Sequence, residues 1–255
     1  MILRRSVRNV SFFVVEEMHG TVYVRMHWRK EQGMKFTESM LRLYAVTDRS
    51  WTGEKTLLEQ VESALKGGVT CVQLREKELD YDTFLAEALQ MKALCSRYGV
   101  PFIVNDNVEI ALKCGADGIH VGQEDMGARE VRAMVGGDMI VGVTAKTVEQ
   151  AVAAQRAGAD YLGSGAVFGS ATKTNARPLS LEALREICGA VDIPVVAIGG
   201  INLRNIRELK NTHIRGVAVV SGIFAAKDIE QECRLLFEGS EKIVNKQFFS
   251  GAPGA

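Results

Sequence analysis

The chain has 255 residues, of which 47% are hydrophobic and 24% charged, an ordinary composition for a globular protein with a sizeable core. Lysine plus arginine and aspartate plus glutamate each number 31, which argues against nucleic acid or a membrane surface as a partner. No apolar run approaches the ~20 residues that cross a bilayer, and the five cysteines lack metal-binding spacing. We therefore expect a cytoplasmic protein with small, buried, reduced cysteines.

Residues 1–40 lack the pattern of the rest of the chain. Val10–Val15 and Thr21–Trp28 would pair as a β-hairpin, because apolar and polar side chains alternate in the second run. A disordered leader is the alternative, and the arginines of residues 1–15 also leave a mitochondrial presequence open. We assign no function to this N-terminal extension.

From Leu41 the chain repeats one unit: an apolar run, a polar break and a segment with helical periodicity. The apolar runs are nearly continuous, as expected for a parallel sheet covered on both faces. Eight such units predict an α/β fold, a (β/α)8 barrel over residues 41–240 with a C-terminal tail at 241–255. A doubly wound open sheet is the alternative. The expected strands are Arg42–Thr47, Val69–Leu74, Phe102–Asn105, Gly118–Val121, Ile140–Thr144, Tyr161–Gly163, Pro194–Ile198 and Gly216–Val220.

Polar residues follow the expected strands rather than precede them. Asn105 and Asp106 end the third strand, and Asp125 comes just after the fourth. The carboxyl ends of barrel strands form the active face, and Mg²⁺ prefers one or two carboxylates together with substrate phosphates and water. We therefore predict that Asp106 and Asp125 bind Mg²⁺ and a phosphorylated substrate, with helix capping as the alternative role. The cations expected nearby are Arg75, Lys77 and Lys173.

Small residues dominate the loops after the last three strands. The sixth strand leads into "GSGAVFGSATKTNARP", and the next two lead into "AIGGIN" and "VVSGIF". Backbone N–H groups at such turns bind phosphate, and barrels commonly use the loops after strands 7 and 8 for this purpose. His120 lies inside an apolar run, and we interpret it as a packed core histidine rather than a catalytic one.

Six motifs occur in order between about Leu41 and Phe224: "LYAVTDR", "VQLREK", "PFIVNDNVEIALKCGADGIHVGQEDM", "GADYLGSGAVFGSATK", "VAIGGI" and "GVAVVSGIF". Taken together, these segments resemble the thiamine phosphate synthase family. The family is a (β/α)8 barrel that joins 4-amino-2-methyl-5-hydroxymethylpyrimidine diphosphate to 4-methyl-5-hydroxyethylthiazole phosphate. The resemblance implies a Mg²⁺-dependent transferase of thiamine biosynthesis that acts on two small molecules and releases diphosphate. It leaves a homodimer open.

The resemblance also implies roles for individual residues. Asp106 and Asp125 would hold Mg²⁺ on the pyrimidine diphosphate, which would depart first and leave a carbocation-like methylene for the thiazole nitrogen to attack. That step needs positive charge on the leaving group more than acid–base catalysis. The implied catalytic residues are Arg75, Lys77, Lys173 and Thr144. The implied substrate contacts are Gln73, Arg75, Lys77, Asn105, Thr144 and Lys173 for the pyrimidine diphosphate, and Ser170, Thr172, Gly200, Val220 and Ser221 for the thiazole phosphate.

Two positions depart from the family pattern. Thr144 stands where the family usually has serine, which keeps the hydroxyl and adds a methyl group. Gly169-Ser170 replaces the usual Pro-Thr beside the thiazole site. A thiazole tautomerase-like isomerase and a non-catalytic barrel that binds thiamine intermediates are the alternative functions. The first does not need the full diphosphate-binding set, and only the altered loop favours the second.

Overall fold

The computed structural model describes residues 12–18, 21–27, 35–169 and 178–248 of the chain. The chain divides into two units, Met1–Lys35 and Phe36–Ala255. In the first unit, β1 (Phe12–Met18) pairs antiparallel with β2 (Thr21–His27). No helix in the described part of the chain combines the length and the hydrophobicity needed to cross a membrane.

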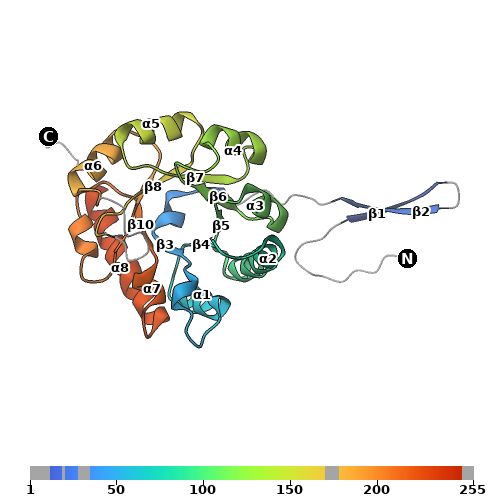
Figure 1. Ribbon diagram of the computed structural model, residues 1–255, viewed down its shortest axis with the longest axis horizontal. Coiled ribbons are helices and arrows are strands. Elements are labelled where there is room, and N and C mark those ends of the chain that lie inside the picture. The colour runs from blue at the N-terminus through green and yellow to red at the C-terminus, as the bar shows by residue number, and fades with distance from the viewer. Residues whose placement is uncertain (1–11, 19–20, 28–34, 170–177, 249–255) are drawn as a thin grey trace. The chain divides into compact units, whose positions relative to one another are not determined.

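Eight parallel strands of the second unit form a closed barrel, in which β10 is hydrogen-bonded to β3 (Figure 1). Val217 of the last strand lies in register with Leu43 of the first, so the sheet closes on itself. The predicted (β/α)8 barrel is confirmed, and the open-sheet alternative is wrong because of this closure. The strands are β3 (Leu43–Val46), β4 (Cys71–Leu74), β5 (Phe102–Asn105), β6 (Gly118–Val121), β7 (Ile140–Thr144), β8 (Tyr161–Gly165), β9 (Val195–Ile198) and β10 (Gly216–Val219).

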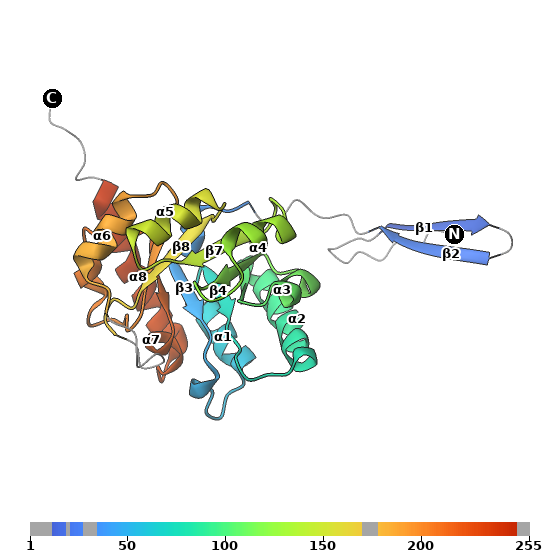
Figure 2. The same ribbon diagram turned by 45° about the horizontal axis from the view of Figure 1, so that its top comes forward.

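Helices alternate with the strands and surround the barrel (Figure 2). Local signals set their ends: Thr56 and Glu59 form a capping box, and the side chain of Asp80 accepts the N–H of Thr83. Caps of this kind each stabilise a helix by about 1 kcal/mol. The helices are α1 (Leu57–Lys66), α2 (Tyr81–Tyr98), α3 (Val108–Cys114), α4 (Ala128–Val135), α5 (Val148–Arg156), α6 (Leu181–Gly189), α7 (Ser221–Phe224) and α8 (Ile229–Phe248), with short 3-10 turns η1 (Glu38–Leu41), η2 (Arg49–Trp51) and η3 (Ile206–Leu209).

The last helix extends beyond the expected end of the barrel domain. We expected that domain to end at residue 240 and a tail to follow, whereas α8 continues to Phe248. Ile243 and Val244 are buried in this extension. The helix therefore continues because its apolar face still has a surface to cover.

The barrel unit contains two apolar cores, because successive side chains of a strand point to opposite faces. One core lies between the strands and the helices, and the other fills the barrel interior. Phe36 lies just before η1 and Met40 lies within it, and both side chains pack against the interior core. They occupy the amino-terminal side of the strands, which leaves the carboxyl-terminal side for polar groups. The buried interior residues are Leu41, Tyr44, Val46, Cys71, Ile103, Ile140, Tyr161, Val196 and Ala218.

Candidate active site

Polar side chains predicted to bind substrate meet at the carboxyl-terminal mouth of the barrel. Asn105 and Thr144 are the last residues of β5 and β7, and Gln73 is the next-to-last residue of β4. Because the strands are parallel and closed into a barrel, these ends lie around one opening. The fold thus brings together residues that are far apart in the sequence.

Asp106 is held in an unusual backbone conformation directly after β5. Its φ of 63° is left-handed, a region in which residues other than glycine are uncommon. Its backbone N–H donates to the carbonyl oxygen of His120 (2.9 Å), and its carboxylate accepts hydrogen bonds from Lys77 Nζ and Asn105 Nδ2. Burial raises the pKa of Asp106, and Asp125 raises it further, against a lowering by Lys77. The carboxylate is therefore positioned where a second cation would stabilise its charge.

Asp125, in the loop after β6, lies close enough to Asp106 for the two carboxyl groups to interact. Its Oδ2 accepts the backbone N–H of Gly122 at 2.8 Å. Helix α3 is capped instead by Asn107, and α4 begins after Gly127 without a side-chain cap. The capping role considered for the two acids is therefore wrong, and their proximity needs another explanation.

The donor set at this position fits Mg²⁺. Two adjacent carboxylates repel each other, and a divalent cation between them relieves that repulsion. In the described ranges, no group of three or more His, Cys, Asp or Glu side chains is arranged to hold a metal ion. Zinc sites need three or four such ligands, whereas Mg²⁺ needs only one or two carboxylates if substrate phosphates and water complete its shell. Asp106 and Asp125 therefore suit Mg²⁺ bound together with an anionic substrate.

Thr47 and Asp48 come directly after β3, and we did not predict either as a site residue from the sequence. The backbone N–H of Arg75 donates to Oγ1 of the buried Thr47 at 3.0 Å. Asp48 is 6% exposed, and its Oδ2 has no hydrogen-bond partner in the described part of the chain. Glu76, the acid that follows Arg75, forms an ion pair with Arg49, with 2.9 Å between Oε1 and Nη2, rather than with Arg75 or Lys77. The sequence signal for Thr47 and Asp48 was their place directly after β3.

Gln73 and Thr144 are connected through side chains inside the barrel. Gln73 Nε2 donates to the Tyr44 hydroxyl (2.6 Å), and His120 Nε2 lies 3.0 Å from Thr144 Oγ1. His120 is buried, as we expected of a core histidine, and is hydrogen-bonded at both ring nitrogens. Sequence reasoning missed Tyr44 and Tyr161, although the alternation of each strand places both at inward-facing positions.

The loops after β8, β9 and β10 approach one another closely. Gly200 has a φ of +67°, and a Cβ atom there would lie 2.6 Å from the carbonyl oxygen of Phe168. A Cβ atom at Gly222 would lie 2.4 Å from the carbonyl oxygen of Ile201. Val220 and Ser221 form the start of α7, next to this contact. Glycine is needed at both positions, and the backbone of Gly200 is thereby brought to the same side of the mouth as Val220–Ser221.

Three predicted site residues, Ser170, Thr172 and Lys173, lie outside the described residues. The described residues on either side of them are held by backbone hydrogen bonds. Phe168 N–H donates to the carbonyl oxygen of Gly199 (3.0 Å), and Leu179 N–H donates to that of Ala166 (2.7 Å). The roles of the three residues stay predictions.

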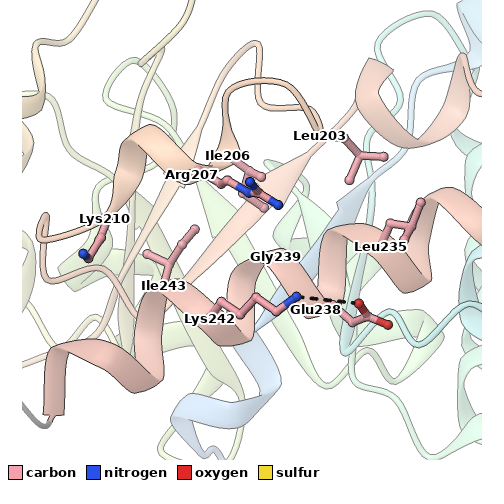
Figure 3. A pocket seen from close by; sticks show the side chains of 9 residues that line it. All are labelled: Leu203, Ile206, Arg207, Lys210, Leu235, Glu238, Gly239, Lys242 and Ile243. Carbon is pink, nitrogen blue, oxygen red and sulfur yellow. Dashed lines mark ion pairs between the residues drawn. The ribbon is translucent and has the colours of Figure 1, made fainter.

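A separate cavity of about 480 Å³ lies between η3 and α8 (Figure 3). Lys242 and Glu238 form an ion pair beside it, with 4.0 Å between Nζ and Oε2. The cavity contains none of the predicted site residues, so we do not assign the chemistry to it. Its lining residues are Leu203, Ile206, Arg207, Lys210, Leu235, Glu238, Gly239, Lys242 and Ile243.

Known proteins are similar to this chain in sequence and in fold. The family model described as thiamine monophosphate synthase matches residues 43–223. The thiamine-phosphate synthase of Ruminiclostridium cellulolyticum is 51% identical over 196 residues, which are 77% of this chain and 93% of that protein. The enzyme of the same name from Clostridium acetobutylicum is 45% identical over 197 residues, with 77% and 93% covered. The structure of thiamine phosphate pyrophosphorylase from Pyrococcus furiosus has a TM-score of 0.76 and 37% identity, covering 81% of this chain and 98% of that one. The chain therefore belongs to the thiamine monophosphate synthase family of transferases.

Proposed function

We propose that the chain condenses 4-amino-2-methyl-5-hydroxymethylpyrimidine diphosphate with 4-methyl-5-hydroxyethylthiazole phosphate to give thiamine phosphate and diphosphate. The observation that carries the proposal is the cluster of Asp106, Asp125 and Lys77 at the barrel mouth, beside Gln73 and Thr144. A paired carboxylate site next to cations suits a substrate that carries a diphosphate.

Asp106 and Asp125 would hold Mg²⁺, which when bound supplies positive charge to the diphosphate. Arg75, Lys77 and Asn105 would contact the same group, as would Lys173, whose position the structure does not describe. The carbon–oxygen bond breaks with its electron pair leaving on the diphosphate, and the thiazole nitrogen then donates its lone pair to the methylene carbon. Placing fixed positive charge on the leaving oxygens lowers the barrier to this cleavage.

The thiazole phosphate occupies the side of the mouth formed by Gly200 and the Val220–Ser221 backbone. The first turn of a helix leaves backbone N–H groups free to bind an anion. Ser170 and Thr172 contact the same phosphate in this proposal. Holding the two substrates in line supplies the rest of the rate acceleration, since correct orientation replaces a bimolecular encounter.

An isomerase on the same barrel would have no use for a carboxylate pair with flanking cations, so we do not favour it. A homodimer is compatible with this proposal. We propose a cytoplasmic location, because four of its five cysteines are buried as small apolar side chains, as is common in proteins of a reducing compartment.

The proposal is tested by incubating the purified full-length chain with both phosphorylated substrates and Mg²⁺ and measuring thiamine phosphate by chromatography. We expect product only when both substrates and the metal are present. Absence of product under these conditions, from a protein with a folded far-UV circular dichroism spectrum, would overturn the proposal.

A further inference from the structure

We propose that a buried chain of hydrogen bonds sets the polarity of the pyrimidine site, so that Gln73 accepts and Thr144 donates a hydrogen bond. The inference rests on the proposed function for its ligand but not for its geometry. The residues that connect Gln73 to Thr144 are Tyr44, Tyr161 and His120. None of these three is needed as a substrate contact. We regard these three as positioning residues.

The chain of hydrogen bonds is continuous through the barrel interior. Gln73 Nε2 donates to Tyr44 Oη at 2.6 Å, and the hydroxyl oxygens of Tyr44 and Tyr161 lie 2.8 Å apart. The Tyr161 hydroxyl lies 3.0 Å from Nδ1 of His120, whose Nε2 lies 3.0 Å from Oγ1 of Thr144. Every link therefore lies within hydrogen-bonding distance.

The barrel makes room for the rings of this chain by placing glycine at two inward-facing positions. A Cβ atom at Gly142 would lie 2.1 Å from Cζ of Tyr161 and 2.5 Å from Nδ1 of His120. A Cβ atom at Gly163 would lie 3.1 Å from Cε1 of the same histidine. The Tyr161 ring is also stacked on Phe36, with 6.1 Å between centroids. The rings are thus held by packing as well as by hydrogen bonds.

The donor-to-acceptor direction of these hydrogen bonds follows from counting the protons that each group carries. Tyr44 accepts from the Gln73 amide, and we assign its single proton to the hydrogen bond with the oxygen of Tyr161 and the Tyr161 proton to Nδ1 of His120. A neutral imidazole that accepts at Nδ1 carries its proton on Nε2, and it therefore donates to Thr144 Oγ1. The Thr144 hydroxyl proton is then left to donate toward the mouth. The Gln73 amide oxygen is left to accept.

Burial keeps the two phenols in the donor state that this direction needs. It raises the pKa of both Tyr44 and Tyr161 well above the ordinary value for tyrosine. The phenols therefore remain protonated across the neutral range. A charged imidazolium would donate at both nitrogens and leave the Tyr161 proton without an acceptor, at a cost in a buried site.

The Gln73 amide oxygen and the Thr144 hydroxyl together favour the binding of one form of a pyrimidine ring. A 4-aminopyrimidine offers an amino N–H to the Gln73 oxygen and an unprotonated ring nitrogen to the Thr144 hydroxyl. A 4-oxopyrimidine offers the reverse, a carbonyl oxygen and a ring N–H. A site whose own groups are fixed rejects the reversed ligand, because two buried polar groups would then be left unpaired.

The first test measures the protonation of His120 without any substrate. Two-bond ¹H–¹⁵N NMR of the full-length labelled chain at pH 8 should show the His120 ring as the Nε2–H tautomer, assigned by the loss of its signals in His120→Gln. Tyr161→Phe should change the nitrogen shifts of His120, since Nδ1 loses its donor. The control Tyr98→Phe, on the exposed end of α2, should leave them unchanged. An Nδ1–H tautomer or an imidazolium at pH 8 would overturn the proposal.

The second test compares the pyrimidine diphosphate with its 4-oxo analogue. In Tyr161→Phe the preference for the amino substrate in kcat/KM should fall by about threefold to tenfold, the worth of one buried hydrogen bond. The KM for the thiazole phosphate should stay at the wild-type value. An unchanged preference in a variant with wild-type thermal stability would contradict a positioning role. If the wild type forms no product, the proposed function fails, while the NMR result still decides the polarity of the chain.

Discussion

Lys77 and Asp106, which follow the neighbouring strands β4 and β5, form an ion pair at the barrel mouth. The lysine side chain is 51% exposed and the aspartate side chain 22% exposed. A pair this open to solvent contributes only about 0–1 kcal/mol to stability. In the proposed mechanism this pair places both charges at the mouth, where Lys77 would turn to a phosphate once a metal ion binds the carboxylate.

Replacing Asp106 with asparagine should remove the metal site while keeping the fold. Asparagine tolerates the left-handed conformation of this position, so thermal stability should change little. We expect kcat to fall by at least about hundredfold, as when a charge-stabilising group is lost. Steady-state kinetics and circular dichroism measure the two effects. Glu130→Gln, an exposed acid on α4, is the control and should turn over normally. Wild-type turnover in Asp106→Asn would rule out the metal role.

Removing the metal should also be visible in stability. A ligand present at about 100 times its Kd stabilises the folded state by about 2.7 kcal/mol, and 1 kcal/mol shifts Tm by about 2–4 °C in a chain of this size. Mg²⁺ with inorganic diphosphate should therefore raise Tm, and EDTA should reverse the rise. Scanning calorimetry of Asp125→Asn should show a much smaller shift. An equal Mg²⁺-dependent shift in that variant would place the metal elsewhere.

Gly200→Ala should weaken the proposed thiazole phosphate site. The added methyl meets the carbonyl oxygen of Phe168, and the positive φ itself costs about 1–3 kcal/mol in strain. We expect a raised KM for the thiazole phosphate and a smaller effect on the pyrimidine diphosphate. Gly189→Ala is a matched control, because a Cβ atom there has no neighbour within 4 Å. Equal KM values for the thiazole phosphate in both variants would show that Gly200 is not part of the phosphate site.

Gly142→Ala should destabilise the barrel interior. Its Cβ atom would lie 2.1 Å from the Tyr161 ring, so the ring and His120 must move. Overpacking of this kind costs about 1–3 kcal/mol, which urea denaturation would detect. At Gly137 a Cβ atom meets open space, and Gly137→Ala should leave the free energy of unfolding nearly unchanged. If Gly142→Ala also left the free energy of unfolding nearly unchanged, the ring packing described for the barrel interior would be wrong.

Shortening the chain at its amino terminus should separate the extension from the barrel. A chain that begins at Phe36 retains the residues that pack into the barrel interior, and should keep its Tm and any measured turnover. A chain that begins at Arg42 also loses Phe36, Met40 and Leu41. Loss of large apolar residues from a core typically costs about 2–5 kcal/mol each, so this shorter chain should unfold at lower temperature. Equal Tm values would show that these residues do not support the barrel.

Much of the barrel could be predicted because its signals are local. The observed bounds of Phe102–Asn105, Gly118–Val121 and Ile140–Thr144 are those expected from the sequence. A continuous apolar run that stops at a polar residue marks such a strand, whatever surrounds it. The order of polar residues after the strands likewise placed Asp106 and Asp125 at the mouth.

Other features could not be derived from local patterns. Asn105, Asp106 and Asn107 are all good capping residues, and only the path of the backbone gives the cap of α3 to Asn107. With the capping task taken by its neighbour, Asp106 is free to face Asp125 and Lys77. The end of α8 depended on a surface that the rest of the chain provides.

The sequence by itself therefore determined the barrel, the family and the acids, because strand periodicity and strand-end chemistry are written in consecutive residues. The tertiary structure alone decided how these groups act on one another. Tyr44, Tyr161, His120 and the glycine at 142 come from four different strands, and only closure of the sheet brings them within hydrogen-bonding distance or van der Waals contact. Contacts between residues so distant in the chain leave no periodic trace in it, since each strand carries only one member of the set.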